Sequence, residues 1–101
     1  MIHVLAHIEL NPGTRESFLT EFHKIVAPVR AEDGCLEYGP TIDAATDIAS
    51  QQTSPDRVIV VEKWESLAHL KAHLAAPHML AYRPKVKNYV RQTILHITEP
   101  A

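Results

Sequence analysis

The chain has 101 residues, of which 46% are hydrophobic and 22% are charged, and its formal net charge is −2. This balance is typical of one globular domain over residues 1–101 and excludes a disordered chain. The basic residues are scattered, which argues against a nucleic-acid or anionic-membrane surface. The single Cys35 cannot form an internal disulfide and suits a reducing compartment. The N-terminal stretch indicates neither a signal peptide nor a membrane span, so we expect a cytoplasmic protein without membrane insertion.

The first third of the chain predicts a strand followed by a helix. Residues 2–10 place apolar side chains on alternate positions, as in a strand. Asn11-Pro12-Gly13 ends this strand and places Pro12 near the first helical turn. We expect the helix to bend or loosen at Pro28 and to end before Gly34. Its sheet-facing stripe consists of Phe18, Phe22, Ile25, Val26 and Val29.

Two strands with a long connection between them follow. Residues 35–43 predict a short strand in which Pro40 is confined to an edge or a bulge. Residues 43–56 are polar and without a period, which indicates either a lid or subunit-contact loop, or an ordinary surface loop. Residues 57–64, RVIVVEKW, form the clearest strand. This strand is apolar on both faces and should therefore be covered on both.

The last third predicts helical structure followed by a final strand. Ser66 is a good N-cap for a helix that stops at Pro77. A further short helix covers residues 78–89, with Pro84 as a point of interruption, and residues 90–99 form the last strand. The core stripe of the first of these helices is expected to consist of Leu67, Leu70 and Leu74.

The resulting order is β-α-β-β-α-β, which is the ferredoxin-like α+β unit. Two helices cover only one face of a four-stranded sheet. The apolar residues on the other face then need a partner, and a second copy of the same sheet is the simplest one. We therefore expect a homodimer.

Three histidines, His69, His73 and His78, lie within ten positions of the sequence. His69 and His73 are four residues apart and so are neighbours on one helix, a spacing that can serve a metal ion. Zinc and iron sites need a third and usually a fourth ligand, and His78 lies beyond Pro77, outside this helix. We therefore expect no metal site, and a solvated surface position for His69.

The other two histidines suggest an acid–base site. The period of the strand places Glu62 and Trp64 on the face that also carries Val60. If this face looks toward the helices, an acid and an indole meet His73 or His78, and imidazole exchanges protons readily near neutral pH. The alternatives are a structural core histidine and a Glu62 that serves as an edge charge or a dimer salt bridge.

Conventional cofactor motifs are absent from the sequence. Its three glycines are isolated, so no phosphate-binding loop is present. Neither a G-x-S-x-G elbow nor a flavin or nicotinamide fingerprint occurs. We expect an enzyme, if the chain is one, to work without the usual redox cofactors.

Three blocks of sequence resemble the antibiotic biosynthesis monooxygenase family, and within it the bacterial quinol monooxygenase branch. They are Glu32-Asp33-Gly34-Cys35-Leu36-Glu37-Tyr38, Val61-Glu62-Lys63-Trp64-Glu65-Ser66, and Ala72-His73-Leu74 with Pro77-His78-Met79. The resemblance implies a dimeric α/β barrel made of two ferredoxin-like units. It also implies oxidation of a quinol or other electron-rich phenol by O2, with no cofactor.

The resemblance also implies roles for individual residues. Trp64 matches the family's pocket tryptophan, and Glu62, His73 and His78 match its recurrent acid and histidines. We expect either histidine to be the base and Glu62 to hold it. This chain has His7 where haem-degrading relatives carry an asparagine, which argues against haem degradation. The expected substrate contacts are Trp64, Tyr38, Met79 and His7.

Two other functions remain open on the sequence alone, because the fold does not decide the chemistry. One is an isomerase or lyase that acts on a small metabolite with the same histidine and glutamate side chains. The other is a dimeric module that binds a small ligand without catalysis.

Overall fold

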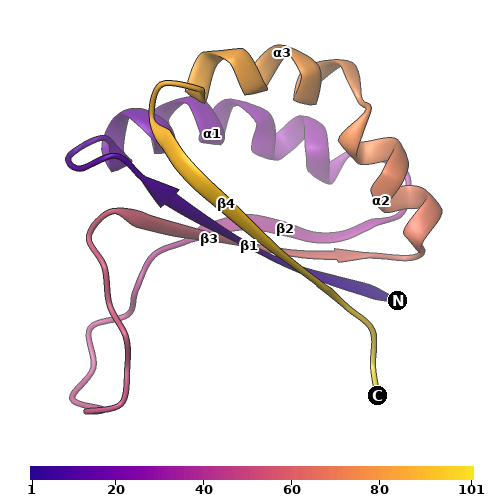
Figure 1. The fold of residues 1–101 in the computed structure, drawn as a ribbon. Coiled ribbons are helices and arrows are strands. Elements are labelled where there is room, and N and C mark those ends of the chain that lie inside the picture. Colours follow the sequence, from indigo (N-terminus) through magenta and orange to yellow (C-terminus); the bar gives the residue numbers. More distant parts are fainter.

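The computed structural model describes residues 1–101 and contains an antiparallel four-stranded sheet with helices on one face (Figure 1). The strand order across the sheet is β2-β3-β1-β4. The α+β class and the ferredoxin-like order of elements are confirmed. None of the helices is both long and apolar enough to cross a membrane. The elements are β1 (Ile2–Leu10), α1 (Arg15–Arg30), β2 (Cys35–Thr41), β3 (Arg57–Trp64), α2 (Leu67–Leu74), α3 (Pro77–Val86) and β4 (Val90–Thr98).

The register of the sheet decides which side chains of β3 face the helices. The central strand β1 pairs with β3 so that Val4 lies opposite Glu62 and Ala6 lies opposite Val60. Cross-strand partners share a face of the sheet. Val4 and Ala6 are buried under the helices, so Glu62 is carried into the same layer. Trp64 continues this face at the end of β3 and is completely buried.

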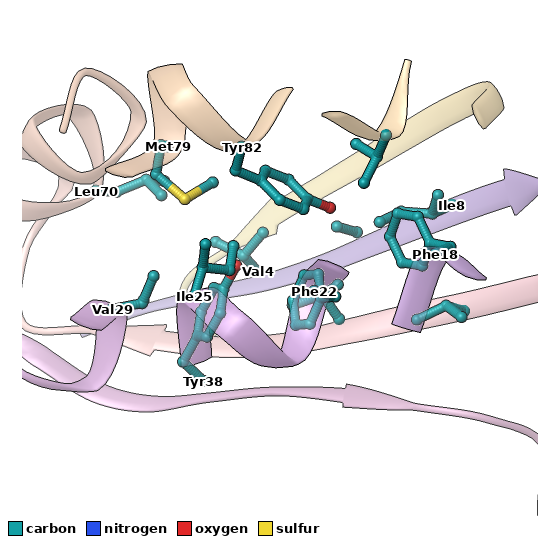
Figure 2. Packing of buried hydrophobic residues seen from close by; sticks show 14 of the residues in the cluster. Val4, Ile8, Phe18, Phe22, Ile25, Val29, Tyr38, Leu70, Met79 and Tyr82 are labelled. Carbon is teal, nitrogen blue, oxygen red and sulfur yellow. The ribbon is translucent and has the colours of Figure 1, made fainter. Parts of the chain in front are cut away.

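Aromatic side chains pack together between the sheet and the helices (Figure 2). The ring of Phe22 in α1 stacks on Tyr38 of β2, with centroids 5.6 Å apart, and meets Tyr82 of α3 edge to face at 5.9 Å. Phe18, one turn earlier, stacks on Phe22 at 5.8 Å. Offset-stacked and edge-to-face pairs of this kind add to the stabilisation from burial alone. These contacts hold α1, α3 and β2 against one another.

The prolines follow the expectation only in part, although α1 does end before Gly34 as predicted. Pro12 lies in the turn before α1, which begins only at Arg15. Pro28 and Pro84 lie inside α1 and α3, and each helix continues past its proline. Both prolines stand near the C-terminal end of their helices. One backbone hydrogen bond is lost there, and little helix remains to be redirected.

The core face of α2 also differs from the expectation. Leu70 and His73 are its buried residues, whereas Leu67 and Leu74 are 47% and 40% exposed. The helix has only eight residues and lies across one end of the sheet (Figure 1), so a narrow face is covered. His69 is half-buried rather than solvated, because its Nε2 lies 3.4 Å from Asp33 and its Nδ1 lies 2.7 Å from the Ser66 hydroxyl.

The connection between β2 and β3 and the edge strand β4 are both open to solvent. β2 ends at Thr41, and the connection then extends beyond the sheet on the side away from the helices (Figure 1). A cavity, described below, lies between the sheet and the helices. None of residues 42–56 lines this helix-side cavity, so the loop is not a lid over the cavity of its own chain. Nearly all side chains of β4 are exposed, on both faces of the sheet. The uncovered second face of β3 leaves Ile59 and Val61 only half-buried.

Candidate active site

Four elements bring the polar side chains of the site together at one end of the sheet. β3 supplies Glu62, α2 supplies His73, and the first turn of α3 supplies His78. The fourth, Glu32, follows α1 in the turn before β2. Gly34 in this turn has φ +79°, and a Cβ there would overlap the imidazole of His69. Only glycine at position 34 therefore lets α2 approach the turn closely enough for His73 to reach Glu32.

Glu32 joins the two histidines through a single oxygen atom. Its Oε2 lies 2.8 Å from His73 Nδ1 and 2.9 Å from His78 Nε2. A carboxylate oxygen only accepts, so each imidazole donates its N–H to Glu32. The tautomer of His73 then leaves the Nε2 lone pair free. A carboxylate behind an imidazole fixes both its ring orientation and its tautomer, as in other acid–base sites.

The free side of His73 faces Glu62 and Trp64. Its Nε2 lies 3.9 Å from Glu62 Oε1, which is too long for a hydrogen bond. The same Glu62 oxygen accepts a hydrogen bond of 3.0 Å from the indole Nε1 of Trp64. The Trp64 ring lies 4.6 Å from the imidazole, between centroids. The hydrogen bond that orients His73 thus comes from Glu32, whereas the sequence analysis had given this role to Glu62.

Burial shifts the pKa values of both groups toward their neutral forms. It raises the pKa of Glu62 from its ordinary value of 4.5 to about 7, although the Trp64 hydrogen bond acts in the opposite direction. Burial lowers the pKa of His73 from 6.5, and the hydrogen bond to Glu32 partly opposes this shift. A buried carboxyl and a neutral imidazole therefore lie side by side near neutral pH. Such a pair can take up and release a proton at a small cost in free energy.

A cavity of about 770 Å³ lies between the sheet and the helices, next to this pair. Thirteen of its nineteen lining residues are hydrophobic, which suits an apolar ligand. Four of the expected catalytic and substrate-binding residues line it: Tyr38, Glu62, His73 and Met79. Trp64 and His78 do not line the cavity. Trp64 instead donates a hydrogen bond to Glu62, and His78 donates one to Glu32.

His7 is not brought to this cavity. In β1 it pairs with Ile59 on one side and with Ile94 on the other, on the face of the sheet away from the helices. Its ring packs edge to face against His96, with centroids 5.2 Å apart. Its expected contact with a substrate in the helix-side cavity therefore has no support in the geometry.

Glu32 is the residue that sequence reasoning missed. It lies in the first of the three blocks that carry the family resemblance, but no periodicity marks it, because it belongs to a turn. Its partners stand 41 and 46 positions further along the chain. Only the packing of α2 and α3 against the turn after α1 brings the three side chains together. The signal in the sequence was the acidic turn that precedes Gly34.

Fold and site together define a class of protein. It is a small ferredoxin-like domain in which a large apolar cavity opens beside a buried acid and an imidazole. The family model described as antibiotic biosynthesis monooxygenase matches residues 1–85. The chain is also 42% identical to "Probable quinol monooxygenase YgiN" of Escherichia coli (strain K12), over 99% of this chain and 98% of that protein. The chain therefore belongs to the antibiotic biosynthesis monooxygenase family, as the sequence resemblance indicated.

Solved structures agree with this assignment. The structure of Rv0793 from Mycobacterium tuberculosis superposes with a TM-score of 0.82 at 25% identity, covering 99% of this chain and 94% of the other. PA3566 from Pseudomonas aeruginosa gives a TM-score of 0.83 at 24% identity, covering 99% and 93%. The second likeness shows the shared fold alone.

Proposed function

We propose that this chain oxidises a hydroquinone or a related electron-rich phenol with molecular oxygen, without a flavin or metal cofactor. One observation carries the proposal. The imidazole of His73 is 2% exposed, lines an apolar cavity beside Glu62, and is held from the far side by Glu32. The name of the E. coli relative points to the same class of substrate.

The cavity suits a flat aromatic substrate. Its volume of about 770 Å³ falls in the usual range for small-molecule sites, roughly 300–1,000 Å³. Tyr38 and Met79 provide aromatic and sulfur surface for the ring. A phenolic hydroxyl that points at the polar end of the cavity then meets His73 and Glu62. The substrate is thereby desolvated and oriented in one step.

His73 is the base in this proposal, and Glu32 is the residue that positions it. His73 Nε2 accepts the phenolic proton while its Nδ1–H stays bonded to Glu32. His78 is not assigned this role, because it contacts Glu32 but does not line the cavity. The phenolate is a much better electron donor than the phenol, so it reduces oxygen directly. Proton transfer of this kind is worth about 10²–10⁴ in rate.

The electrons balance in two ways. In an oxidase reaction, two electrons and two protons leave the quinol, which gives the quinone and hydrogen peroxide. In a monooxygenase reaction, one oxygen atom enters the ring and the other leaves as water, which gives a hydroxyquinone. Mass spectrometry of the product formed under 18O2 separates the two outcomes.

Oxygen uptake with menadiol on chelator-treated protein tests the proposal. The rate of oxygen uptake with wild type should exceed that of the autoxidation blank. In His73→Gln this excess rate should be lower by a factor of about 10²–10⁴. His69→Gln is the matched control, because His69 is also on α2 but does not line the cavity. Equal rates for wild type and His73→Gln would show that the base assignment is wrong. Turnover of a metabolite without oxygen would favour an isomerase or lyase, and binding alone a non-catalytic module.

We further propose that two chains pair through the open faces of their sheets in the cytoplasm, as a dimeric α/β barrel. On this face Leu5 and Ile94 are each 41% exposed, and Ile59 and Val61 are half-buried. Such an apolar face on a small domain indicates an interaction surface. Light scattering should report a dimer for wild type and for Leu67→Asp, which changes an exposed leucine of α2, and a monomer for Ile94→Asp. A dimeric Ile94→Asp would contradict this interface.

A further inference from the structure

The cluster formed by Glu32, His73 and His78 has a second chemical capability besides holding a proton. One carboxylate oxygen and two imidazole nitrogens lie within 4.8 Å of one another. They come from the turn after α1, from α2 and from α3. We propose that these three side chains bind a divalent transition-metal ion of the zinc type. The spacing in the sequence pairs His73 with His69, whereas the cluster joins His73 to His78 and to Glu32, 41 residues before His73.

The donor set fits such an ion. Imidazole suits zinc, nickel, copper and iron, and two imidazoles with one carboxylate leave a further position for water or an exchangeable ligand. Ligand atoms around tetrahedral zinc stand about 3.4 Å apart at bond lengths near 2.1 Å. The observed separations from Glu32 Oε2 are 2.8 and 2.9 Å, so each nitrogen would move away from the oxygen by roughly half an ångström. An ion would take the place of the two bridging hydrogen bonds.

One ligand is rigid and another can adjust. The side chain of His73 is 2% exposed and is fixed by the Trp64 ring. The side chain of His78, at the start of α3, is 28% exposed, and that of Glu32 is 14% exposed. The cluster is therefore open to solvent on this side. The cluster therefore has an entry path for an ion, as well as a partly exposed side chain that can adjust its position.

A second carboxylate lies on the other side of the buried ligand, His73. The nitrogen of His73 that faces away from Glu32 lies 3.9 Å from Glu62 Oε1. Histidines that ligate metals usually place their other nitrogen against a carboxylate, which fixes the ring and raises its basicity as a ligand. Closing the present gap by about 0.7 Å would make this hydrogen bond. Glu62 is thus placed near the position that the outer partner of a metal-bound His73 would occupy.

His69, a neighbour of His73 on α2, lacks the further ligands that a metal site needs. His69 lies 3.4 Å from Asp33 and 2.7 Å from the Ser66 hydroxyl, but it belongs to no comparable group of three ligands. It stands on the same helix as His73 and carries the same side chain. His69 is therefore the matched control for the cluster.

The metal would act as an inhibitor, a consequence that rests on the proposed function. An ion bonded to His73 Nδ1 leaves the other ring nitrogen with the hydrogen atom. The imidazole then has no lone pair with which to accept a phenolic proton. The metal site and the base are two alternative uses of one side chain.

Calorimetric titration of chelator-treated protein with zinc chloride tests the site itself. Wild type and His69→Gln should each bind one ion per chain with the same affinity. Glu32→Gln and His78→Gln, each shown to be folded by circular dichroism, should bind at least tenfold more weakly. X-ray absorption at the zinc edge should find two nitrogen ligands and oxygen at about 2.0–2.2 Å. No binding by wild type, or unchanged affinity in both variants, would overturn the proposal.

Activity in the presence of zinc separates the two proposals. Oxygen uptake by wild type with menadiol should fall as zinc saturates the calorimetric site and should return after addition of a chelator. If zinc binds and uptake is unchanged, the inhibitory role is wrong and the site stands. If zinc binds in a protein that never oxidises a quinol, the proposed function fails while the metal site is retained.

Discussion

The two faces of the sheet carry histidines in very different surroundings. On the helix-covered face, His73 is 2% exposed and bonded to Glu32 at 2.8 Å. On the open face, His7 packs edge to face against His96, between apolar neighbours on adjacent strands. The residue type is the same, but only the first imidazole combines burial, a carboxylate partner and a cavity. Surroundings of this kind make a histidine a candidate base.

The apolar residues on the two faces differ in a corresponding way. Those under the helices form one cluster of sixteen buried residues that also shapes the cavity. Those on the open face, such as Leu5 and Ile94, are half-exposed and do not line this cavity. We infer that the covered face supplies stability and chemistry, and that the open face supplies association. Each prediction below tests this division.

The largest expected effect is on stability. Phe22→Ala removes a ring that contacts Phe18, Tyr38 and Tyr82, and should lower the free energy of unfolding by roughly 3–5 kcal/mol. Ile94→Ala on the open face should cost about 0.5 kcal/mol or less when the chain is monomeric. Urea titration, at concentrations where light scattering reports a monomer, measures both. Similar costs for the two variants would contradict the division between the faces.

The second prediction concerns the pH dependence of stability. Because burial raises the pKa of Glu62 from 4.5 to about 7, the folded chain retains a proton that the unfolded chain loses between these pH values. The contribution of Glu62 to stability therefore falls as the pH rises through this window, by about 3 kcal/mol in total, and is constant above it. Glu62→Gln cannot lose a proton, and its amide oxygen still accepts from Trp64.

Urea titrations of both proteins at several pH values measure this difference. Relative to wild type, Glu62→Gln should become steadily more stable from pH 4.5 to 7, and the difference should level off above pH 7. The depressed pKa of His73 acts in the opposite sense, adding stability as the pH rises toward 6.5, but it is present in both proteins. Parallel stability curves would show that Glu62 titrates normally.

Local patterns in the sequence were sufficient to predict most of the fold. The alternation in residues 57–64 placed Glu62 and Trp64 on one face of a strand, and the structure confirms this. The helical stripe of α1 is also confirmed in its main residues, because Phe18, Phe22, Ile25 and Val29 are buried. The spacing of apolar residues along one element is a local property, so it can be recognised in a single sequence.

The misses have a common physical cause. Leu67 and Leu74 look like core residues, but only the placement of α2 across the end of the sheet decides which of its faces is covered. Glu32 meets His73 and His78 through the packing of three helices, and no local pattern encodes this contact. The expectation of no metal stays untested, but it was argued from ligands close together in the sequence and did not consider one as distant as Glu32. Contacts between elements far apart in the sequence require the tertiary structure.

The third prediction separates positioning from chemistry. Glu32→Gln keeps a side chain of the same size but loses the charge that holds the Nδ1–H tautomer of His73. Its kcat for menadiol should fall by about 10- to 100-fold with little change in KM, because the cavity wall is intact. Glu37→Gln, which changes an exposed carboxylate paired with Lys63, is the control and should retain its kcat. A normal kcat for Glu32→Gln would mean that His73 needs no such support.

The smallest effect is expected on the open face. His7→Gln should change kcat/KM for menadiol by less than about twofold, because His7 lies on the other side of the sheet from the cavity and from His73. Steady-state oxygen uptake measures this ratio, with light scattering as a check that the chain still associates as wild type does. A large loss of kcat/KM in an intact dimer would restore the substrate contact expected from the sequence. It would also move the reaction, or part of it, to the face between the two sheets.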